Sequence, residues 1–320
     1  MSPRLRGSLI ALAGTTAWAF TGIFISWLLI HHTIAPLTLA FWRDLFTGVG
    51  LAGLLAVFRP AALRLRRSDI PFFLVYGFVG MAVFNACWTF SVQLNGAAVA
   101  TVLAYSSPAF TVLLARLALG EALTAPKLVA VAVSLAGCAL VAGAYDPQVW
   151  RVNPLGVLLG LATGAAFAFY NLAGRWSAGR FDSAWTVTTY GFLFAAGALL
   201  ILQSLPFLTP GSPVAALFSL GPAWDGWLTL GVLALGPTLL GFGLYTRSLR
   251  DLPAGVASLI ASLEPVLTAL IAIPVLGEHM SPVQWLGAAL ILGAVLLVQW
   301  EAWRERSAEP AWAEPAPRAN

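Results

Sequence analysis

The chain has 320 residues, of which 59% are hydrophobic and 9% are charged, and its mean hydropathy is +0.85. A soluble globular domain carries about 25% charged residues, so this composition excludes a soluble protein and indicates an integral membrane protein. The net charge of +4 is small. It reflects the placement of basic residues around the membrane and gives no reason to expect nucleic-acid binding.

Ten apolar stretches follow one another along the chain with short connections between them. Each is long enough for a helix to cross the hydrocarbon core, which takes about 20 apolar residues. They are too long and too uniformly apolar for the alternating strands of an outer-membrane barrel. The pattern predicts an all-α integral membrane protein with ten transmembrane helices at 8–30, 36–58, 70–93, 96–118, 126–144, 154–176, 183–205, 225–248, 253–276 and 282–303.

Basic residues give the expected orientation. Ten spans place 15 of the 17 Lys and Arg residues on the same side as both termini, with Arg43 inside a span and Arg151 on the opposite side. Because cytoplasmic loops are enriched in basic residues, both termini are predicted to be cytoplasmic. The expected organisation is a cytoplasmic N-terminus (1–7), a first five-helix repeat (8–144), an external connection (145–153), a second five-helix repeat (154–303) and a disordered cytoplasmic tail (304–320).

Two segments of the chain are near copies of each other. Ala97–Glu121 and Ala254–Glu278 agree at 11 of 25 positions at a constant offset of 157, including the prolines Pro108 and Pro265 and a closing Leu-Gly-Glu. Apolar helices agree by chance at only about one position in eight, so the match indicates duplication. An odd number of spans per repeat inverts the second repeat in the membrane, as in secondary transporters that rock around a midplane site. Duplication kept only for stability is the alternative.

Several strings resemble EamA-type members of the drug/metabolite transporter superfamily. They are Ser107-Pro108 to Gly120-Glu121, Leu263-Glu264-Pro265 to Gly277-Glu278, the run Gln284–Gly293, and Phe41-Trp42-Arg43. The resemblance covers residues 8–303 and implies two inverted five-helix halves, with the fifth and tenth helices peripheral and a central cavity between the others. It also implies transport of small organic metabolites, often amino acids and commonly outward. Members differ widely in substrate, so the resemblance leaves the substrate open.

The shared prolines, Pro108 and Pro265, lie near mid-membrane. A proline cannot donate to the carbonyl four residues earlier, which leaves the Ala104 and Ala261 carbonyls as free acceptors. Lipid cannot satisfy such acceptors, so a neighbouring helix, water or substrate must do so. We expect both prolines to be hinges under a central site; a kink that serves only helix packing is the alternative.

Three ionisable residues fall within spans and away from the span ends: Arg43, Asp44 and Glu264. Charges in hydrocarbon are costly, so these side chains should face the protein interior or water. Glu264 stands where the first copy has Ser107, and it could carry protons, pair with a substrate ammonium, or serve as a static partner of Arg43 or of the kink. Arg43 could receive a substrate carboxylate. Asp44 lies about 100° further round the helix and is expected to face another neighbour.

Aromatic and amide side chains at mid-depth complete the expected substrate site. A small-molecule site is usually apolar with a few fixed polar groups, although aromatic residues in a bundle also serve ordinary packing. The substrate-binding candidates, besides Arg43 and Glu264, are Trp18, Asn85, Trp88, Tyr105, Phe167, Tyr170, Asn171 and Tyr245.

Other classes of function have little support. The three histidines lack spaced carboxylate partners, and no Gly-rich loop with lysine could hold ATP phosphates. We therefore predict no enzyme activity, metal or cofactor. The prediction is a secondary transporter of small organic metabolites, amino acids first among them, working by alternating access in the bacterial inner membrane. Its expected partners are the substrate, protons and lipid, without nucleic acid, and the chain is expected to act as a monomer. A channel-type facilitator is the alternative, with a membrane enzyme as the weaker one.

Overall fold

The computed structural model describes residues 3–32, 34–147, 153–205, 217–276 and 280–308. Helices, and no strands, are found within these ranges. Nine helical stretches of the described chain are long and apolar enough to cross a membrane, and Ala125–Val141 is a further, shorter apolar helix. The predicted all-α, ten-span membrane fold is confirmed, while the orientation of the termini stays a prediction.

The first repeat contains three spans that the sequence predicted as single helices and that the structure divides, the fourth of them between Ala104 and Ser107. The first span is broken at Phe20, and the third contains a π-helical turn, η3. The elements are α1 (Pro3–Ala19), α2 (Thr21–His31), α3 (Pro36–Phe58), η1 (Pro60–Leu63), η2 (Arg67–Asp69), α4 (Ile70–Gly77), η3 (Phe78–Val83), α5 (Phe84–Ala104), α6 (Ser107–Leu119) and α7 (Ala125–Val141).

The second repeat has the same order of spans. Its elements are α8 (Pro154–Ser177), α9 (Ala184–Gln203), α11 (Trp224–Leu233), η5 (Ala234–Thr238), α12 (Leu239–Ser248), α13 (Ala254–Ala261), α14 (Glu264–Leu276) and α15 (Pro282–Ala308). Helix α15 continues past residue 303 into the segment expected to be a tail. The rest of that segment, 309–320, lies outside the described residues.

The two repeats share two backbone irregularities as well as part of their sequence, whereas the break at Phe20 has no counterpart in α8. Helix α5 ends at Ala104 and α13 at Ala261, which correspond at the offset of 157. Helices α6 and α14 begin and end at corresponding residues too. The π-helical turns η3 and η5 overlap at the same offset. These two irregularities are therefore properties of the repeating unit.

Between Ser91 and Leu103, within the residues assigned to α5, the chain reverses direction and so separates the third span from the fourth. A Cβ placed on Gly160 would lie 2.8 Å from Ser91 Oγ and 2.7 Å from Leu103 Cβ. In a straight helix these two residues would be about 18 Å apart. Because both meet the same point on α8, the chain doubles back between them, as the predicted spans 70–93 and 96–118 require.

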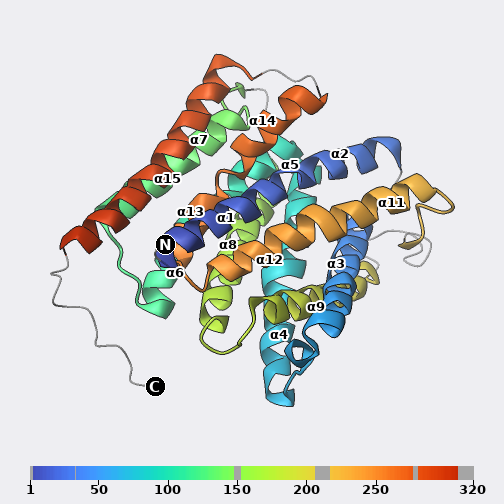
Figure 1. Ribbon diagram of the computed structural model, residues 1–320. Coiled ribbons are helices and arrows are strands. Elements are labelled where there is room, and N and C mark those ends of the chain that lie inside the picture. Colours follow the sequence, from blue (N-terminus) through green and yellow to red (C-terminus); the bar gives the residue numbers. More distant parts are fainter. Residues whose placement is uncertain (1–2, 33, 148–152, 206–216, 277–279, 309–320) are drawn as a thin grey trace, which may run out of the picture.

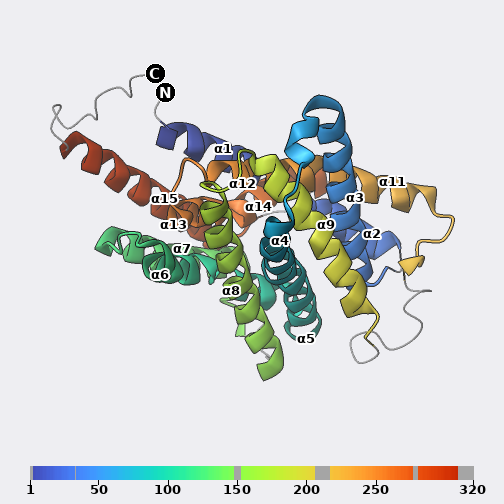
Figure 2. The same ribbon diagram turned by 90° about the horizontal axis from the view of Figure 1, so that it is seen from below.

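The repeats pack against each other in matched pairs. Helix α1 lies against α12, and α8, its counterpart, lies against α5, while α3 pairs with α9, α6 with α13, and α7 with α15. Figures 1 and 2 show α7 and α15 side by side at one edge of the molecule. They cross where each of Gly137 and Gly287 would place a Cβ 2.7 Å from the carbonyl oxygen of the other. The remaining helices surround the centre.

Candidate substrate site

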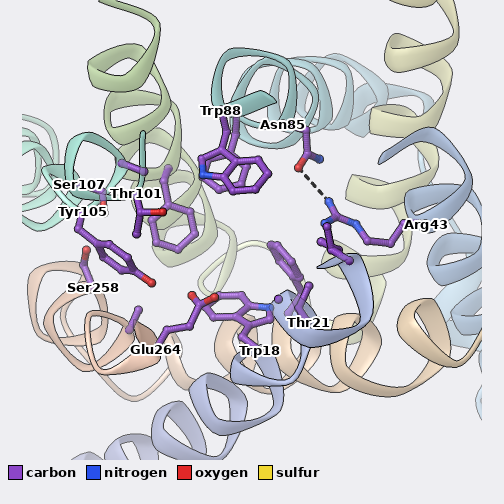
Figure 3. Close-up of a pocket in the computed structure, with 17 residues that line it drawn as sticks. Trp18, Thr21, Arg43, Asn85, Trp88, Thr101, Tyr105, Ser107, Ser258 and Glu264 are labelled. Atoms are coloured by element: carbon purple, nitrogen blue, oxygen red, sulfur yellow. Dashed lines mark hydrogen bonds between the residues drawn. The ribbon is translucent and has the colours of Figure 1, made fainter. Parts of the chain in front are cut away.

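A cavity of about 200 Å³ lies between the two repeats (Figure 3). Its walls come from both halves of the chain, and no residue of α7, α9 or α15 contributes to them. This matches the expectation of a central cavity with the fifth and tenth helices at the edge. The lining residues are Trp18, Thr21, Gly22, Ile25, Arg43, Phe84, Asn85, Trp88, Thr101, Ala104, Tyr105, Ser107, Phe167, Phe242, Ser258, Ala261 and Glu264.

Seven of the ten predicted substrate-binding residues line this cavity. The structure does not bring Tyr170, Asn171 and Tyr245 into its wall. Each of the three is at most 1% exposed, and they lie behind the aromatic side chains that face the cavity. A helix has several faces, and the side chains of these three residues point into the protein core. The seven are Trp18, Arg43, Asn85, Trp88, Tyr105, Phe167 and Glu264.

The three excluded residues form a closed hydrogen-bonded layer. The Tyr245 hydroxyl donates to Asn171 Oδ1 at 2.8 Å, and Asn171 Nδ2 donates to Thr111 Oγ1 at 3.1 Å. Tyr170 shares a hydrogen bond of 2.6 Å with Thr246. Because these polar atoms are satisfied by one another, the layer can stay dry and closed. It lies between the cavity and the end of the bundle where α1 begins, because Tyr170 and Tyr245 follow the cavity residues Phe167 and Phe242 along α8 and α12.

Trp18 joins this layer to the cavity. Its ring centroid lies 4.7 Å from that of Phe242 and 4.8 Å from that of Tyr245. Phe167 packs against Trp18 in an edge-on arrangement, with centroids 6.0 Å apart. Edge-on and tilted contacts of this kind favour a fixed ring orientation. The apolar wall of the site is therefore a preformed cluster of aromatic rings.

Arg43 reaches the cavity from α3 and is held by two partners. Its Nη2 donates to Asn85 Oδ1 at 2.8 Å and, with Nε, to Asp44 Oδ1 at 3.2 Å. Asn85 Nδ2 donates to the other Asp44 oxygen at 3.1 Å. The expectation that Asp44 faces a different neighbour is wrong, because the long Arg43 side chain bends back to the adjacent carboxylate. The buried Asp44 therefore balances the Arg43 charge and fixes its guanidinium.

The carboxylate of Glu264 lies across the cavity from Arg43 (Figure 3). Tyr105, Ser107 and Ser258, which carry hydroxyl groups, lie on the same side of the cavity as Glu264. Arg43 forms its ion pair with the Asp44 carboxylate. Glu264 is thus available to the cavity, and it begins α14 where the first repeat begins α6 with Ser107.

The predicted hinge prolines lie directly after the helix breaks. Pro108 and Pro265 are in the first turns of α6 and α14, where a missing N–H costs nothing. Ala104 and Ala261 both line the cavity. Their carbonyls receive no helical hydrogen bond from Pro108 and Pro265, which lack an N–H. The geometry places two interrupted backbones at the site. A hinge motion itself stays a prediction.

Sequence comparison decides the family. The family model described as "EamA-like transporter family" matches residues 5–143 and again residues 154–300, once for each repeat. The chain belongs to the EamA-like transporter family. It is accordingly a membrane transporter, and the resemblance seen in the paired Pro and Gly-Glu segments is confirmed.

Relatives of this EamA-like transporter are themselves transporters by name. The chain is 25% identical to "Uncharacterized inner membrane transporter YicL" of Salmonella typhimurium, over 96% of this chain and 100% of that protein. It is 28% identical to "Uncharacterized transporter YwfM" of Bacillus subtilis, over 95% and 97%. It is also 28% identical to a "Probable terminal-alkyne amino-acid exporter" of Streptantibioticus cattleyicolor, over 91% and 92%. With its apolar helices, this is a multi-pass protein of the bacterial inner membrane.

A solved crystal structure has the same fold. It superposes with a TM-score of 0.75 at 20% sequence identity, covering 93% of this chain and 98% of that one. At this identity the match speaks for the fold alone. No group of three or more His, Cys, Asp or Glu side chains that could hold a metal is found in the described part of this EamA-like chain.

The sequence did not reveal the break in the first span. Thr21, Gly22 and Ile25, which follow the break at Phe20, all line the cavity. The hydroxyls of Thr15 and Thr16 bond back to Ala11 and Leu12 carbonyls at 2.9 Å, a pattern that bends helices. This Thr pair, followed closely by Gly22, is the signal that could have been used.

Ion pairs and hydrogen bonds to carbonyl groups close the end of the bundle where α1 begins. Arg6 and Arg247 both bind the Asp251 carboxylate at 3.1 Å, which links α1 to the turn between α12 and α13. Partial burial raises the pKa of Asp251, but hydrogen bonds and charge from Arg6 and Arg247 outweigh it, and the pKa lies below its usual range. Arg175 donates to the Leu249 carbonyl at 2.9 Å. This end is therefore tied across helices from both repeats.

Proposed function

We propose that this EamA-like transporter is a secondary carrier that exports amino acids or closely similar zwitterions by alternating access. The observation that carries the proposal is the cavity with Arg43 on one side, Glu264 on the opposite side and aromatic rings between them (Figure 3). A guanidinium suits a carboxylate, and a carboxylate suits an ammonium. An apolar pocket with few polar groups at its ends is the usual form of a small-molecule site.

The paired packing of the repeats supports alternating access. The cavity is separated from one end of the bundle by the Tyr170, Asn171 and Tyr245 layer and by the Arg6–Asp251 ion pair. Two repeats with corresponding breaks, between α5 and α6 and between α13 and α14, can exchange conformations, which would open that end and close the other. Cytoplasmic termini would make the closed end the cytoplasmic one. Protons are the proposed coupling ion, with Glu264 as the group that carries them.

One relative is named a probable amino-acid exporter, which agrees with a zwitterionic substrate. A channel-type facilitator is the competing function. The closed polar layer favours a carrier, because a channel needs a path that is open to both sides at once. A single chain supplies the whole lining of the cavity, which supports transport by a monomer.

Reconstituted liposomes test the proposal. Liposomes that contain the protein would be loaded with unlabelled amino acids, and radiolabelled L-leucine or L-phenylalanine would be added outside. A carrier shows saturation and counterflow, and Arg43→Gln should abolish both, whereas Arg151→Gln, on the predicted external connection, should have no effect. Flux that does not saturate and shows no counterflow would point to a channel. Absence of flux for every amino acid would refute the substrate class.

A further inference from the structure

Uncommitted hydrogen-bond donors line the cavity, and two of them lie at the break between α1 and α2. The Trp18 indole nitrogen and the hydroxyl oxygens of Thr21 and Ser258 are buried and have no hydrogen-bond partner in the described part of the chain. All three residues line the cavity. Trp18 is 5% exposed and Ser258 is 1% exposed. Buried polar atoms are rarely left unpaired, so these atoms indicate a missing partner.

The chemistry of these groups indicates which partner is missing. An indole N–H can only donate, so the atom that satisfies Trp18 must be an acceptor. Thr21 is the first residue of α2, a helix of 11 residues, and both Thr21 and Gly22 face the cavity at its N-terminal end. Backbone amides at the start of a helix are free donors at the positive end of the helix dipole. An anionic oxygen would satisfy these donors together.

In Figure 3 Arg43 lies across the cavity from Glu264, and Trp18 lies between Glu264 and Thr21 with its nitrogen-bearing edge toward Thr21. The Arg43 charge is already balanced by the buried Asp44 carboxylate. Arg43 alone is therefore a weak receptor for a second anion. The helix break beside it adds donors that no carboxylate of the protein occupies.

We propose that the break between α1 and α2 is the carboxylate-binding subsite of this transporter. The substrate carboxylate accepts hydrogen bonds from the Trp18 indole, the Thr21 hydroxyl and the first amides of α2, with Arg43 beside it. This assignment rests on the proposed function and names the end of the site that recognises the anion. Half-helix N-termini at mid-membrane recognise anionic groups in the same way in other broken-helix transporters.

The site is built by one repeat only. The span of the second repeat that corresponds to α1 and α2 is the unbroken helix α8. The carbonyl of Ala19 at the break accepts from Thr268 Oγ1 at 3.1 Å, whereas Thr111, the repeat partner of Thr268, accepts from Asn171. Because only the first repeat offers this anion subsite, the substrate would keep one orientation relative to the two repeats throughout transport.

The test compares ligands that differ only in their charged groups. Purified full-length protein in nanodiscs would be titrated calorimetrically with L-phenylalanine, with phenethylamine, which lacks the carboxylate, and with 3-phenylpropionate, which lacks the ammonium. A matching set is L-leucine, isopentylamine and 4-methylpentanoate. The variants are Thr21→Val and Trp18→Phe, which remove one donor each. Thr21→Ser retains the hydroxyl, and Thr16→Val is a control whose hydroxyl is already bonded within α1.

Each donor removed should weaken binding of both carboxylate ligands about tenfold, as for a hydrogen bond to a charged group. Amine binding should be unchanged, and Thr21→Ser and Thr16→Val should resemble the wild type. Equal weakening of the amines, or no weakening at all, would overturn the subsite. Amino-acid counterflow without this discrimination would refute the subsite alone. Donor-dependent binding of the carboxylates without amino-acid transport would refute the proposed function alone, and a wild type that binds no carboxylate would also overturn the subsite.

Discussion

The carboxylate of Glu121 accepts a hydrogen bond of 2.9 Å from the backbone amide of Ala254. Glu121 ends the first near copy in the sequence and Ala254 begins the second, so the bond joins the end of one copy to the start of the other. Ala254 is also the first residue of α13, whose free amides favour a negative charge. The closing glutamate of the first copy is therefore a helix cap. Its counterpart, Glu278, lies outside the described residues.

Removing this cap should destabilise the protein. We expect Glu121→Ala to lower the free energy of unfolding by about 1 kcal/mol, because an amide of α13 loses its acceptor. Glu121→Gln keeps an oxygen in place and should lose less. Thermal unfolding of both variants in detergent would measure the difference. An unchanged melting temperature for Glu121→Ala would show that the bond contributes nothing.

The crossing of α7 and α15 depends on two glycines. A Cβ at Gly137 or Gly287 would lie 2.7 Å from the carbonyl oxygen of the other glycine, so an alanine at either position must push the helices apart. We expect Gly137→Ala and Gly287→Ala each to destabilise the protein by about 1 to 3 kcal/mol. Gly293→Ala is the matched control on α15, because a Cβ there meets no atom within 4 Å. A control that melts as low as the crossing variants would contradict this interpretation.

Variants of the Arg43–Asp44 pair should affect the stability of the protein and its transport activity differently. Arg43→Gln leaves the fully buried Asp44 without a charge partner, and such a loss costs about 3 to 5 kcal/mol. Arg43→Gln combined with Asp44→Asn removes both charges and should recover most of the stability while transport stays abolished. Unfolding and counterflow measured on the same preparations would check this. A double variant that is no more stable than the single one would argue against the pair.

Glu264 should control proton coupling. If it is the proton carrier, Glu264→Gln should abolish uptake driven by a pH gradient, because the amide binds no proton, while exchange of substrate persists in part. Glu301→Gln, on the peripheral helix α15, serves as the control. The measurement is uptake by liposomes with and without an imposed gradient. Unaltered dependence on the gradient in Glu264→Gln would remove this residue from the coupling role.

The Asp251 ion pairs should make stability depend on acidity. Because the folded-state pKa of Asp251 lies below its unfolded value, the carboxylate stabilises the fold above about pH 4, and this contribution is lost as the pH falls through the folded-state pKa. Asp251→Asn should therefore melt below the wild type at pH 7, and the gap should narrow toward pH 3. A gap that is constant over this range would show that the charge of Asp251 is not the cause.

The sequence predicts the fold well because its signals are long and repeated. Ten apolar stretches and a repeat at one offset are enough to place the helices and the central cavity. Trp18, Arg43 and Glu264 were chosen because they are polar or aromatic residues far from the ends of their spans, and all three line the cavity. Depth along a helix can be counted from the sequence. The face of the helix cannot, and Tyr170, Asn171 and Tyr245 accordingly lie behind the cavity wall.

Two features escape the sequence for a different reason. The break at Phe20 contains no proline, and the back-bonds of Thr15 and Thr16 that could have signalled it do not fix its position, where Thr268 of α14 donates to the Ala19 carbonyl. The Arg43–Asp44 contact depends on a side-chain conformation that no residue spacing encodes. Both features depend on tertiary contacts, which form only when the neighbouring helices have packed.

The π-helical turns η3 and η5 occupy overlapping positions in the two repeats. A π turn holds one residue more than an α-helical turn, and the surplus residue rotates everything after it by about 100°. In the first repeat, the residues that follow directly include Asn85 and Trp88, which face the cavity. Both repeats therefore carry a rotation of the helix at this point, and a one-residue deletion within η3 would turn Asn85 and Trp88 away from the cavity.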